Sequence, residues 1–162
     1  MPPDLVPELI VESTPASLAF WVGLCGFRIE YERPDEGFAY LSRGSAHVML
    51  DQRGVGRDWM TGALERPFGR GVNFQIGVTD LDPILSALRA AEHPLFLEPE
   101  TKWYRVDDRR EVGVRQFLVE DPDGYLLRFQ TSLGHRDAAP AASADAAAVL
   151  GRAEKPSAPD PA

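Results

Sequence analysis

The 162-residue sequence has one cysteine, three histidines and no long apolar run, and each shortage excludes a class of protein. Cys25 has no second cysteine to pair with, so an intrachain disulfide and a thiolate zinc cluster are both excluded. No apolar stretch approaches the ~18 residues of a membrane-spanning helix. The first residues, MPPDLVPELIVE, lack the basic and apolar regions of a signal peptide. We therefore expect a cytoplasmic protein with no membrane partner.

Basic residues are also in the minority. The chain has 17 Lys and Arg against 25 Asp and Glu, which gives a formal net charge of −8 and a pI near 4.9. A nucleic-acid surface needs clustered Lys and Arg to neutralise phosphates, so no nucleic-acid partner is expected. The acidic balance suits a cationic or neutral ligand. The hydrophobic share of 44% is that of an ordinary globular domain with a core.

The same order of elements occurs twice along the chain. In the first half the patterns predict a strand over 9–12, a helix over 15–24 and strands over 27–32, 38–42 and 46–52. In the second half they predict a strand over 72–78, a helix over 81–92, strands over 94–98 and 101–106 broken near Pro99, and a hairpin over 114–120 and 125–131. Each half reads β-α-β-β-β, which favours a duplicated α+β fold with a cavity between the halves.

These repeats set the expected domain organisation. Module one covers about residues 5–52, a linker rich in glycine and aromatic residues covers 53–70, and module two covers 71–132, all within a single domain over 1–135. Residues 136–162 are rich in Ala and Pro, and we expect them to be disordered.

Two local patterns add detail to these elements. Thr79 and Asp82 have the spacing of a capping box before the second helix. Phe27, Ile29 and Tyr31 alternate with charged residues, which predicts a half-buried strand with these three side chains on one face.

The most specific segment is FLVEDPDGYLLRFQ, residues 117–130. Two apolar strands flank Asp121-Pro122-Asp123-Gly124, which is typical of a hairpin with Asp-Gly at its tip. Together with the SLAFW helix at 17–21 and the duplication, this hairpin resembles the vicinal-oxygen-chelate superfamily. That superfamily includes glyoxalase I, extradiol dioxygenases, fosfomycin-resistance enzymes and bleomycin-resistance proteins. The resemblance covers roughly residues 5–132 and implies two modules whose curved mixed sheets enclose a cleft.

The resemblance also implies where a metal would bind. The ligand positions fall on Val6, on Met49 or Leu50, on Asn73 and on Arg128. None of these side chains suits a divalent metal, and an arginine would repel it. We therefore expect no metal, no cofactor and no catalytic residue. The chain resembles the bleomycin-resistance branch, whose members are homodimers that sequester a drug in interface clefts lined by aromatic and acidic groups.

The expected function is metal-free binding of a small cationic or aromatic molecule of the bleomycin type. One alternative is a metal-dependent lyase or dioxygenase with atypical ligands near His47 and Asp51, and another is a binding module for an unrelated metabolite. The candidate ligand-binding residues are Phe38, Tyr40, His47, Asp51, Trp59, Phe68, Trp103, Tyr104 and Arg115.

Several of these candidates have a second interpretation. Phe38 and Tyr40 share a strand face and either line the cleft or fill the core. Trp59 and Phe68 are either a ligand lid or anchors for the linker. Trp103 and Tyr104 face opposite sides of a strand, so one of them lines the cleft and the other packs in the core. Arg115 contacts either a carboxylate or an anionic ligand.

Overall fold

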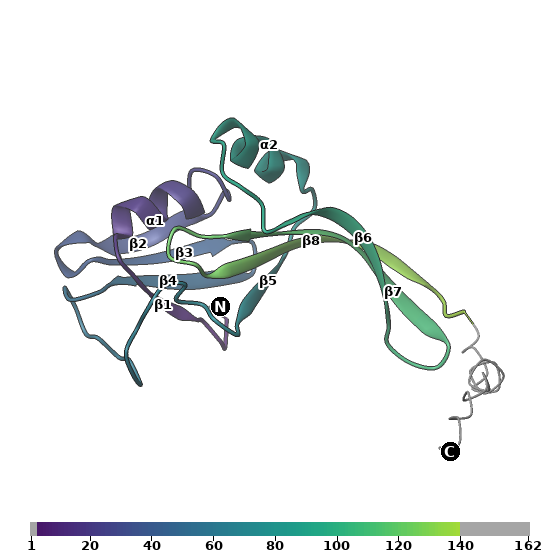
Figure 1. Cartoon of the computed structure of the whole chain (residues 1–162), viewed down its shortest axis with the longest axis horizontal. Coiled ribbons are helices and arrows are strands. Elements are labelled where there is room, and N and C mark those ends of the chain that lie inside the picture. The colour runs from purple at the N-terminus through teal and green to yellow at the C-terminus, as the bar shows by residue number, and fades with distance from the viewer. Residues whose placement is uncertain (1–2, 140–162) are drawn as a thin grey trace, which may run out of the picture.

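Each half of the chain forms one four-stranded mixed sheet with one helix, as the element order predicts. In the computed structural model, which describes residues 3–139, sheet A has the order β1-β4-β3-β2 and sheet B the order β5-β8-β7-β6 (Figure 1). The first and last strands of each module pair in parallel, and the other neighbours are antiparallel. The α+β class with two modules is thereby confirmed.

The bounds of the elements repeat the β-α-β-β-β order in both modules. Module one contains β1 (Glu8–Val11), α1 (Thr14–Trp21), β2 (Arg28–Arg33), a short 3₁₀ turn η1 (Pro34–Glu36), β3 (Phe38–Arg43) and β4 (Ala46–Gln52). Module two contains β5 (Asn73–Gly77), α2 (Asp82–Ala90), β6 (Leu97–Arg105), β7 (Arg110–Glu120) and β8 (Leu126–Asp137). Neither helix is long and apolar enough to cross a membrane, within the part of the chain that is described.

The two helices begin in different ways. Ser13 caps α1, and its hydroxyl accepts a hydrogen bond from the Ala16 N–H at 3.3 Å. The capping box predicted for α2 is wrong, because Leu81 holds the cap position without a side-chain bond. The Asp80 carboxylate instead accepts the Asp82 N–H at 2.9 Å, since a short Asp side chain readily bonds to the backbone two residues ahead.

Strand β2 departs from its predicted alternation. The pairing of β2 with β3 shifts between Ile29 and Tyr31, so a bulge at Glu30 reverses the faces of the side chains on either side of it. Phe27 therefore packs in the core, whereas Tyr31 is 51% exposed on the opposite face. The prediction of a half-buried strand is wrong, because every residue of this edge strand is exposed.

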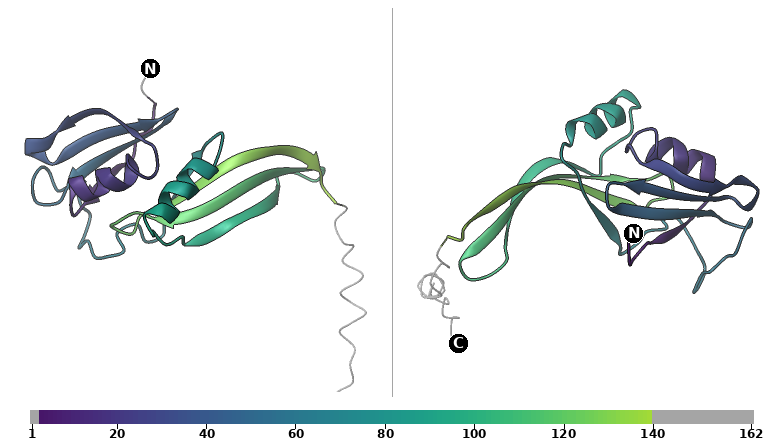
Figure 2. Two further views of the ribbon diagram at one scale, coloured as in Figure 1. Left: turned by 90° about the horizontal axis from the view of Figure 1, so that it is seen from above. Right: turned by 180° about the vertical axis from the view of Figure 1, so that it is seen from behind.

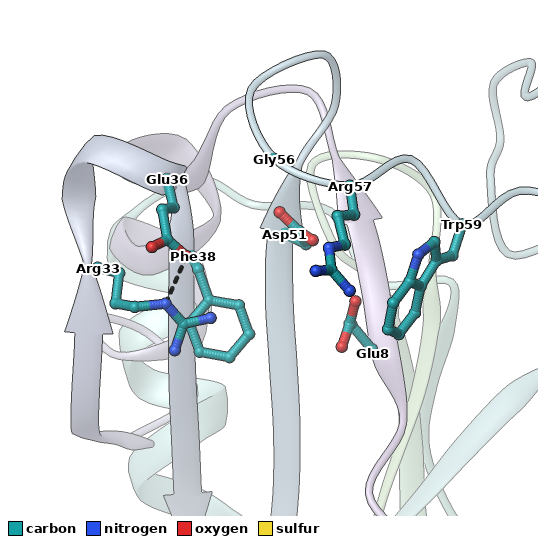
Figure 3. Close-up of a pocket in the computed structure, with 8 residues that line it drawn as sticks. All are labelled: Glu8, Arg33, Glu36, Phe38, Asp51, Gly56, Arg57 and Trp59. Carbon is teal, nitrogen blue, oxygen red and sulfur yellow. Dashed lines mark hydrogen bonds and ion pairs between the residues drawn. The ribbon is translucent and has the colours of Figure 1, made fainter.

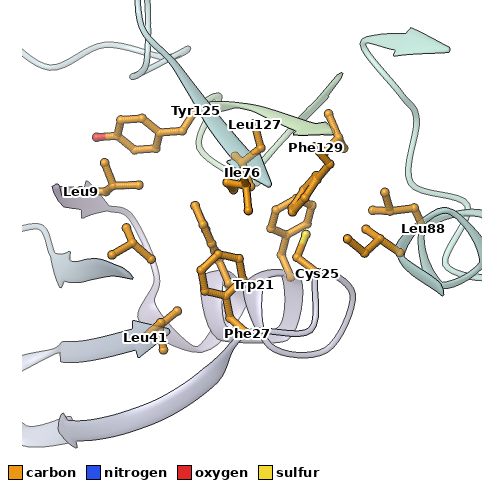
Figure 4. Close-up of a cluster of buried hydrophobic side chains, with 14 of the residues drawn as sticks. Leu9, Trp21, Cys25, Phe27, Leu41, Ile76, Leu88, Tyr125, Leu127 and Phe129 are labelled. Carbon is orange, nitrogen blue, oxygen red and sulfur yellow. The ribbon is translucent and has the colours of Figure 1, made fainter. Parts of the chain in front are cut away.

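One hydrophobic core joins the two modules. Side chains from the helix-facing sides of both sheets meet those of α1 and α2 in this core (Figure 4). Module one contributes Trp21 from the end of α1 and Cys25 from the turn after this helix. Sheet B contributes Ile76, Leu127 and Phe129. The opposite face of each sheet, which we call its outer face, is left outside the core.

The Asp121–Gly124 turn of module two is bound to module one. The indole N–H of Trp21 donates to Asp121 Oδ2 at 3.2 Å, and the backbone N–H of Glu12 donates to Asp123 Oδ2 at 3.2 Å. The Tyr125 hydroxyl donates to the carbonyl of Ile10 at 3.0 Å. The hairpin therefore holds the two modules in register and covers the outer edge of β1.

Sheet B is longer than predicted. Strand β5 pairs only with Leu126–Gln130, and β8 continues to Asp137 paired with β7 alone, so the three strands β6, β7 and β8 extend away from the modules (Figure 2). This ribbon passes residue 132, where the sequence predicts the end of module two. The predicted break near Pro99 is a register shift between Leu97 and Glu100 within a continuous β6. The tail predicted to be disordered lies outside the described residues from position 140 onward.

Candidate functional site

The outer face of sheet A carries a group of acidic and aromatic side chains from module one. On β3 and β4 the core-facing residues are Ala39, Leu41, Val48 and Leu50, so their neighbours along each strand face outward. The resulting outer-face set is Glu8, Tyr31, Arg33, Phe38, Tyr40, His47, Met49 and Asp51. Strand geometry therefore accounts for the meeting of residues that are more than 40 positions apart.

A pocket of about 500 Å³ lies at one end of this face, where the linker passes over the sheet (Figure 3). Strands β1, β3 and β4 supply Glu8, Phe38 and Asp51, and the other walls come from β2, η1 and the linker. The lining residues are Glu8, Arg33, Glu36, Phe38, Asp51, Gly56, Arg57 and Trp59.

Asp51 is the deepest charged side chain of the pocket. It is only 8% exposed, and within residues 3–139 its carboxylate has neither a hydrogen bond nor an ion pair. Burial raises the pKa of Asp51, and the nearby Asp58 and Glu36 raise it further, while Arg33 opposes them. The Asp51 carboxylate lines the pocket and has no donor from the described residues, so it is free to accept hydrogen bonds from a bound group.

Glu8 adds a second carboxylate at the mouth of the pocket. It is exposed, yet burial of its carboxyl group and the charge of Asp51 both raise its pKa, while Arg33 lowers it. Arg33 does not neutralise either acid by direct contact, because its Nε donates to Glu36 Oε2 at 2.6 Å. Two carboxylates thus remain available to a cationic ligand.

A ladder of rings leads away from the pocket across the outer face. The Arg33 guanidinium lies 3.8 Å from the centre of the Phe38 ring, and the Tyr31 ring stacks beside Phe38 at 6.0 Å. Tyr31 and Tyr40 stack at 5.1 Å with their planes 9° apart, and the Tyr40 hydroxyl lies 3.0 Å from His47 Nδ1. The bulge in β2 creates this ladder, since without it Tyr31 would face the core.

The linker completes the pocket with Trp59. This indole is 70% exposed and lies beside Glu8 in the close-up, with the Arg57 guanidinium 5.7 Å from its ring (Figure 3). An exposed tryptophan at the mouth of a charged pocket supplies a large flat surface for a ligand. The exposed position agrees with the lid interpretation of Trp59 and not with a buried anchor.

Phe38, Asp51 and Trp59 are the predicted residues that meet in the pocket, and Tyr40 continues the ring ladder. His47 shares the face of Asp51 but lies four residues away along β4, which places the two about 13 Å apart. His47 lines a separate groove between the modules with Phe74 and Gln75. The suggestion that His47 and Asp51 hold one metal therefore has no geometric support.

The other predicted residues lie elsewhere. Phe68 packs against Tyr125 with ring centres 6.3 Å apart, so it anchors the linker. Trp103 lies over Gly113, and the Arg136 guanidinium sits 4.2 Å from its ring.

Tyr104 and Arg115 also belong to sheet B and lie on opposite faces of it. The Tyr104 hydroxyl accepts a hydrogen bond from Gln116 Nε2 at 2.9 Å on the outer face. Arg115 pairs with Asp82 of α2 at 3.1 Å on the helix side, which agrees with its interpretation as a partner of a carboxylate and not of an anionic ligand.

Sequence reasoning missed Glu8, Arg33, Glu36 and Arg57 as pocket residues. Glu8 precedes the predicted first strand by one residue, and only the parallel pairing of Glu8 with Met49 brings it beside β4. Arg33 and Glu36 follow the predicted second strand. Its bulge and the η1 turn decide their direction, and neither has a strong signal in a single sequence.

The residues present do not fit the metal that many vicinal-oxygen-chelate proteins use. Within residues 3–139 no three His, Cys, Asp or Glu side chains converge on one point. Among the described residues, the pocket offers only the two free carboxylates of Glu8 and Asp51, which are too few oxygen ligands to hold a divalent cation.

Comparison with known proteins places this chain in a family. A solved structure from Vibrio splendidus 12B01, a glyoxalase/bleomycin resistance protein/dioxygenase superfamily member, is 37% identical in sequence. The match covers 78% of this chain and 95% of that chain, with a TM-score of 0.35. The chain belongs to this superfamily. This family assignment depends on the sequence identity of 37%. The similarity of fold is seen in other solved structures.

Two other solved structures share the fold of this chain. TioX from Micromonospora sp. ML1 is 24% identical over 80% of this chain and 98% of its own, with a TM-score of 0.60. A glyoxalase/bleomycin resistance protein/dioxygenase from Alicyclobacillus acidocaldarius is 15% identical over 82% of this chain and 94% of its own, with a TM-score of 0.54. No family model and no curated protein matches the chain. The sequence identity to the Vibrio splendidus protein thus shows the superfamily.

Proposed function

We propose that this superfamily member binds and sequesters a small cationic, aromatic molecule of the bleomycin type on the outer face of sheet A. The observation that carries the proposal is a pocket that combines two available carboxylates with Phe38 and the exposed Trp59, and that adjoins the stacked rings of Tyr31 and Tyr40. A bound cation supplies the counter-charge that Asp51 lacks.

Electrostatics supports a cation over an anion. The pocket is lined by Glu8, Glu36 and Asp51 against Arg33 and Arg57, and Asp58 lies close enough to raise the pKa of Asp51. The Arg33–Glu36 pair is internally neutral. The remaining charges favour a positive ligand, and their attraction is stronger in a partly desolvated pocket than in water.

The ring ladder supports a planar ligand. Tyr31 stacks against both Phe38 and Tyr40 and is half exposed, so a flat heterocycle can pack beside it. Trp59 offers a second flat surface from the linker. Aromatic faces attract both heterocycles and cations, which matches one ligand carrying both groups.

We also propose a homodimer in which a second copy closes the pocket. The pocket of one chain is walled by sheet A and the linker only, while the outer face of sheet B carries Tyr104, Gln116 and Arg128 and extends into the ribbon. A second copy that places sheet B over sheet A would enclose the ligand. Sedimentation velocity at micromolar concentration should give a dimer mass, and a monomer at all concentrations would contradict this part.

The test of the binding function is a titration of the full chain with metal-free bleomycin, followed by calorimetry and by tryptophan emission. We expect saturable binding at micromolar drug and a change in emission that is lost in Trp59→Phe, because Trp21 is buried and Trp103 lies on the ribbon. Phe68→Leu, in an anchor outside the pocket, is the matched control and should keep the signal. Calorimetric silence from the folded protein would reject the bleomycin assignment.

A further inference from the structure

Asp51 differs from every other acid of the pocket because the residue is mostly buried while its carboxylate is unpaired and lines an opening. The residue is 8% exposed, whereas Glu8 is exposed and Glu36 is bonded to Arg33. Among the described residues it receives no N–H or O–H donor at all, although it lines the pocket. A bound ligand with an N–H or O–H group can therefore supply the hydrogen-bond donor that Asp51 lacks.

Building on the proposed function, we infer that Asp51 selects a ligand carrying a compact ammonium group with N–H donors, and discriminates against a quaternary ammonium. An alkylammonium can place its nitrogen about 2.8 Å from a carboxylate oxygen and donate an N–H to it. A quaternary ion has no N–H, and its methyl groups keep the charge away from the oxygens. Binding such an ion would bury the Asp51 carboxylate without a hydrogen bond, which is unfavourable.

The alternative basis for cation binding is the rings, and it predicts the opposite preference. Trp59, Phe38 and Tyr31 could hold a quaternary ammonium by cation–π attraction, which does not need N–H donors. However, the Phe38 face is already occupied by the Arg33 guanidinium at 3.8 Å, and Arg57 lies over Trp59 at 5.7 Å. The chain's own cations thus already lie beside these two rings, whereas the Asp51 carboxylate has no partner among the described residues.

Gly56 controls the approach to Asp51. A methyl group at Gly56 would lie 3.1 Å from Asp51 Oδ1 and 3.3 Å from the carbonyl oxygen of Glu36. The backbone of Gly56 is outside the left-handed region, so alanine is allowed there. The absence of a side chain at this position therefore leaves room for one small group directly above the carboxylate.

The experiment compares three probes that share a phenylethyl body: 2-phenylethylamine, its N,N,N-trimethyl derivative and the neutral 2-phenylethanol. Binding to the full chain is followed by calorimetry and by chemical-shift titration at millimolar probe. We expect the primary amine to bind at least about tenfold more tightly than the trimethyl ion, and the alcohol to bind most weakly. This factor corresponds to the loss of one hydrogen bond to a charged group.

Three variants separate the buried acceptor from general negative charge. Asp51→Asn should reduce the difference between amine and trimethyl ion to less than about twofold. Glu8→Gln should weaken both ions to a similar extent and keep the preference, because Glu8 is exposed and acts through its charge. Glu32→Gln removes an equal charge from exposed β2 outside the pocket, and should change neither value.

Gly56→Ala tests the approach without changing any charge. It should weaken the amine at least about fivefold and leave the thermal midpoint within a few degrees of the wild type. Equal affinities for the two ions, tighter binding of the trimethyl ion, or a preference that survives in Asp51→Asn would overturn the inference. If any of these results were found together with saturable bleomycin binding, only the inference about Asp51 would be rejected. If no aromatic cation bound at all, the proposed function would be rejected as well.

Discussion

The contact between Trp21 and Asp121 should make a measurable contribution to stability, because it joins the two modules inside the core. Trp21 is 1% exposed and Asp121 is 4% exposed, and the indole N–H donates to Oδ2 at 3.2 Å. Asp121 Oδ1 separately accepts the N–H groups of Asp123 and Tyr125, each at 2.9 Å. Asn at position 121 can keep these two turn bonds through its carbonyl oxygen, but its amide group would face the indole donor.

The expected magnitude follows from these contacts. A buried hydrogen bond to a charged group contributes about 1.5–3 kcal/mol, so Asp121→Asn should lower the free energy of unfolding by about 2 kcal/mol. For a domain of this length that lowers the thermal midpoint by about 6 °C. Trp21→Phe loses the same bond and leaves a cavity beside Phe27, which together should cost about 3 kcal/mol.

The assay is a double-mutant cycle of urea unfolding at pH 8, followed by far-ultraviolet circular dichroism. If the indole–carboxylate bond joins the modules, the two substitutions should be less than additive by about 1.5 kcal/mol. A control cycle pairs Trp21→Phe with Glu98→Gln, which lies on β6 outside this contact, and should be additive. A coupling energy for Trp21 and Asp121 below about 0.5 kcal/mol would refute the assignment of the turn as an inter-module latch.

Two further predictions concern the same turn and the pocket. Gly124→Ala should lower the thermal midpoint by at least about 6 °C. Gly124 has a φ of +91°, and a methyl group there would lie 2.4 Å from Pro67 Cβ. The control Gly62→Ala, at an open position with ordinary φ, should leave the thermal midpoint unchanged. Affinity for 2-phenylethylamine should fall as the pH drops through the raised pKa values of Asp51 and Glu8, since a cation needs the ionised carboxylates. This loss should begin at a higher pH than for ordinary carboxyl groups, and constant affinity between pH 8 and pH 4 would contradict it.

The fold could be predicted because its signals are local. Alternation on β3 and β4, the apolar stripe of Leu81, Leu85 and Leu88, and the Asp-Gly turn each lie within a short window. The periodicities of strands and helices therefore sufficed for the order of elements. The length of the ribbon could not be predicted, because β7 and β8 support each other through pairing where the sequence is charged and polar.

The pocket could be predicted only in part. Phe38, Asp51 and Trp59 carry signals of residue type and position, whereas Glu8 enters through a parallel pairing between strands that are distant in sequence. Arg33 and Tyr31 required the bulge, which shifts the alternation by one residue and leaves no clear trace in composition. Residue types thus indicated an acidic and aromatic pocket. Which side chains lie next to one another in it depends on the register of the strands.

The position of the Asp121–Gly124 turn against β1 has a consequence for solubility. An edge strand exposes unpaired backbone groups that can template the addition of a strand from another molecule. Here the Tyr125 hydroxyl donates a hydrogen bond to the carbonyl of Ile10, and the Asp123 carboxylate accepts one from the N–H of Glu12. Loosening the turn would uncover an apolar segment, LIV at 9–11, and open a route to fibrous or amorphous aggregates.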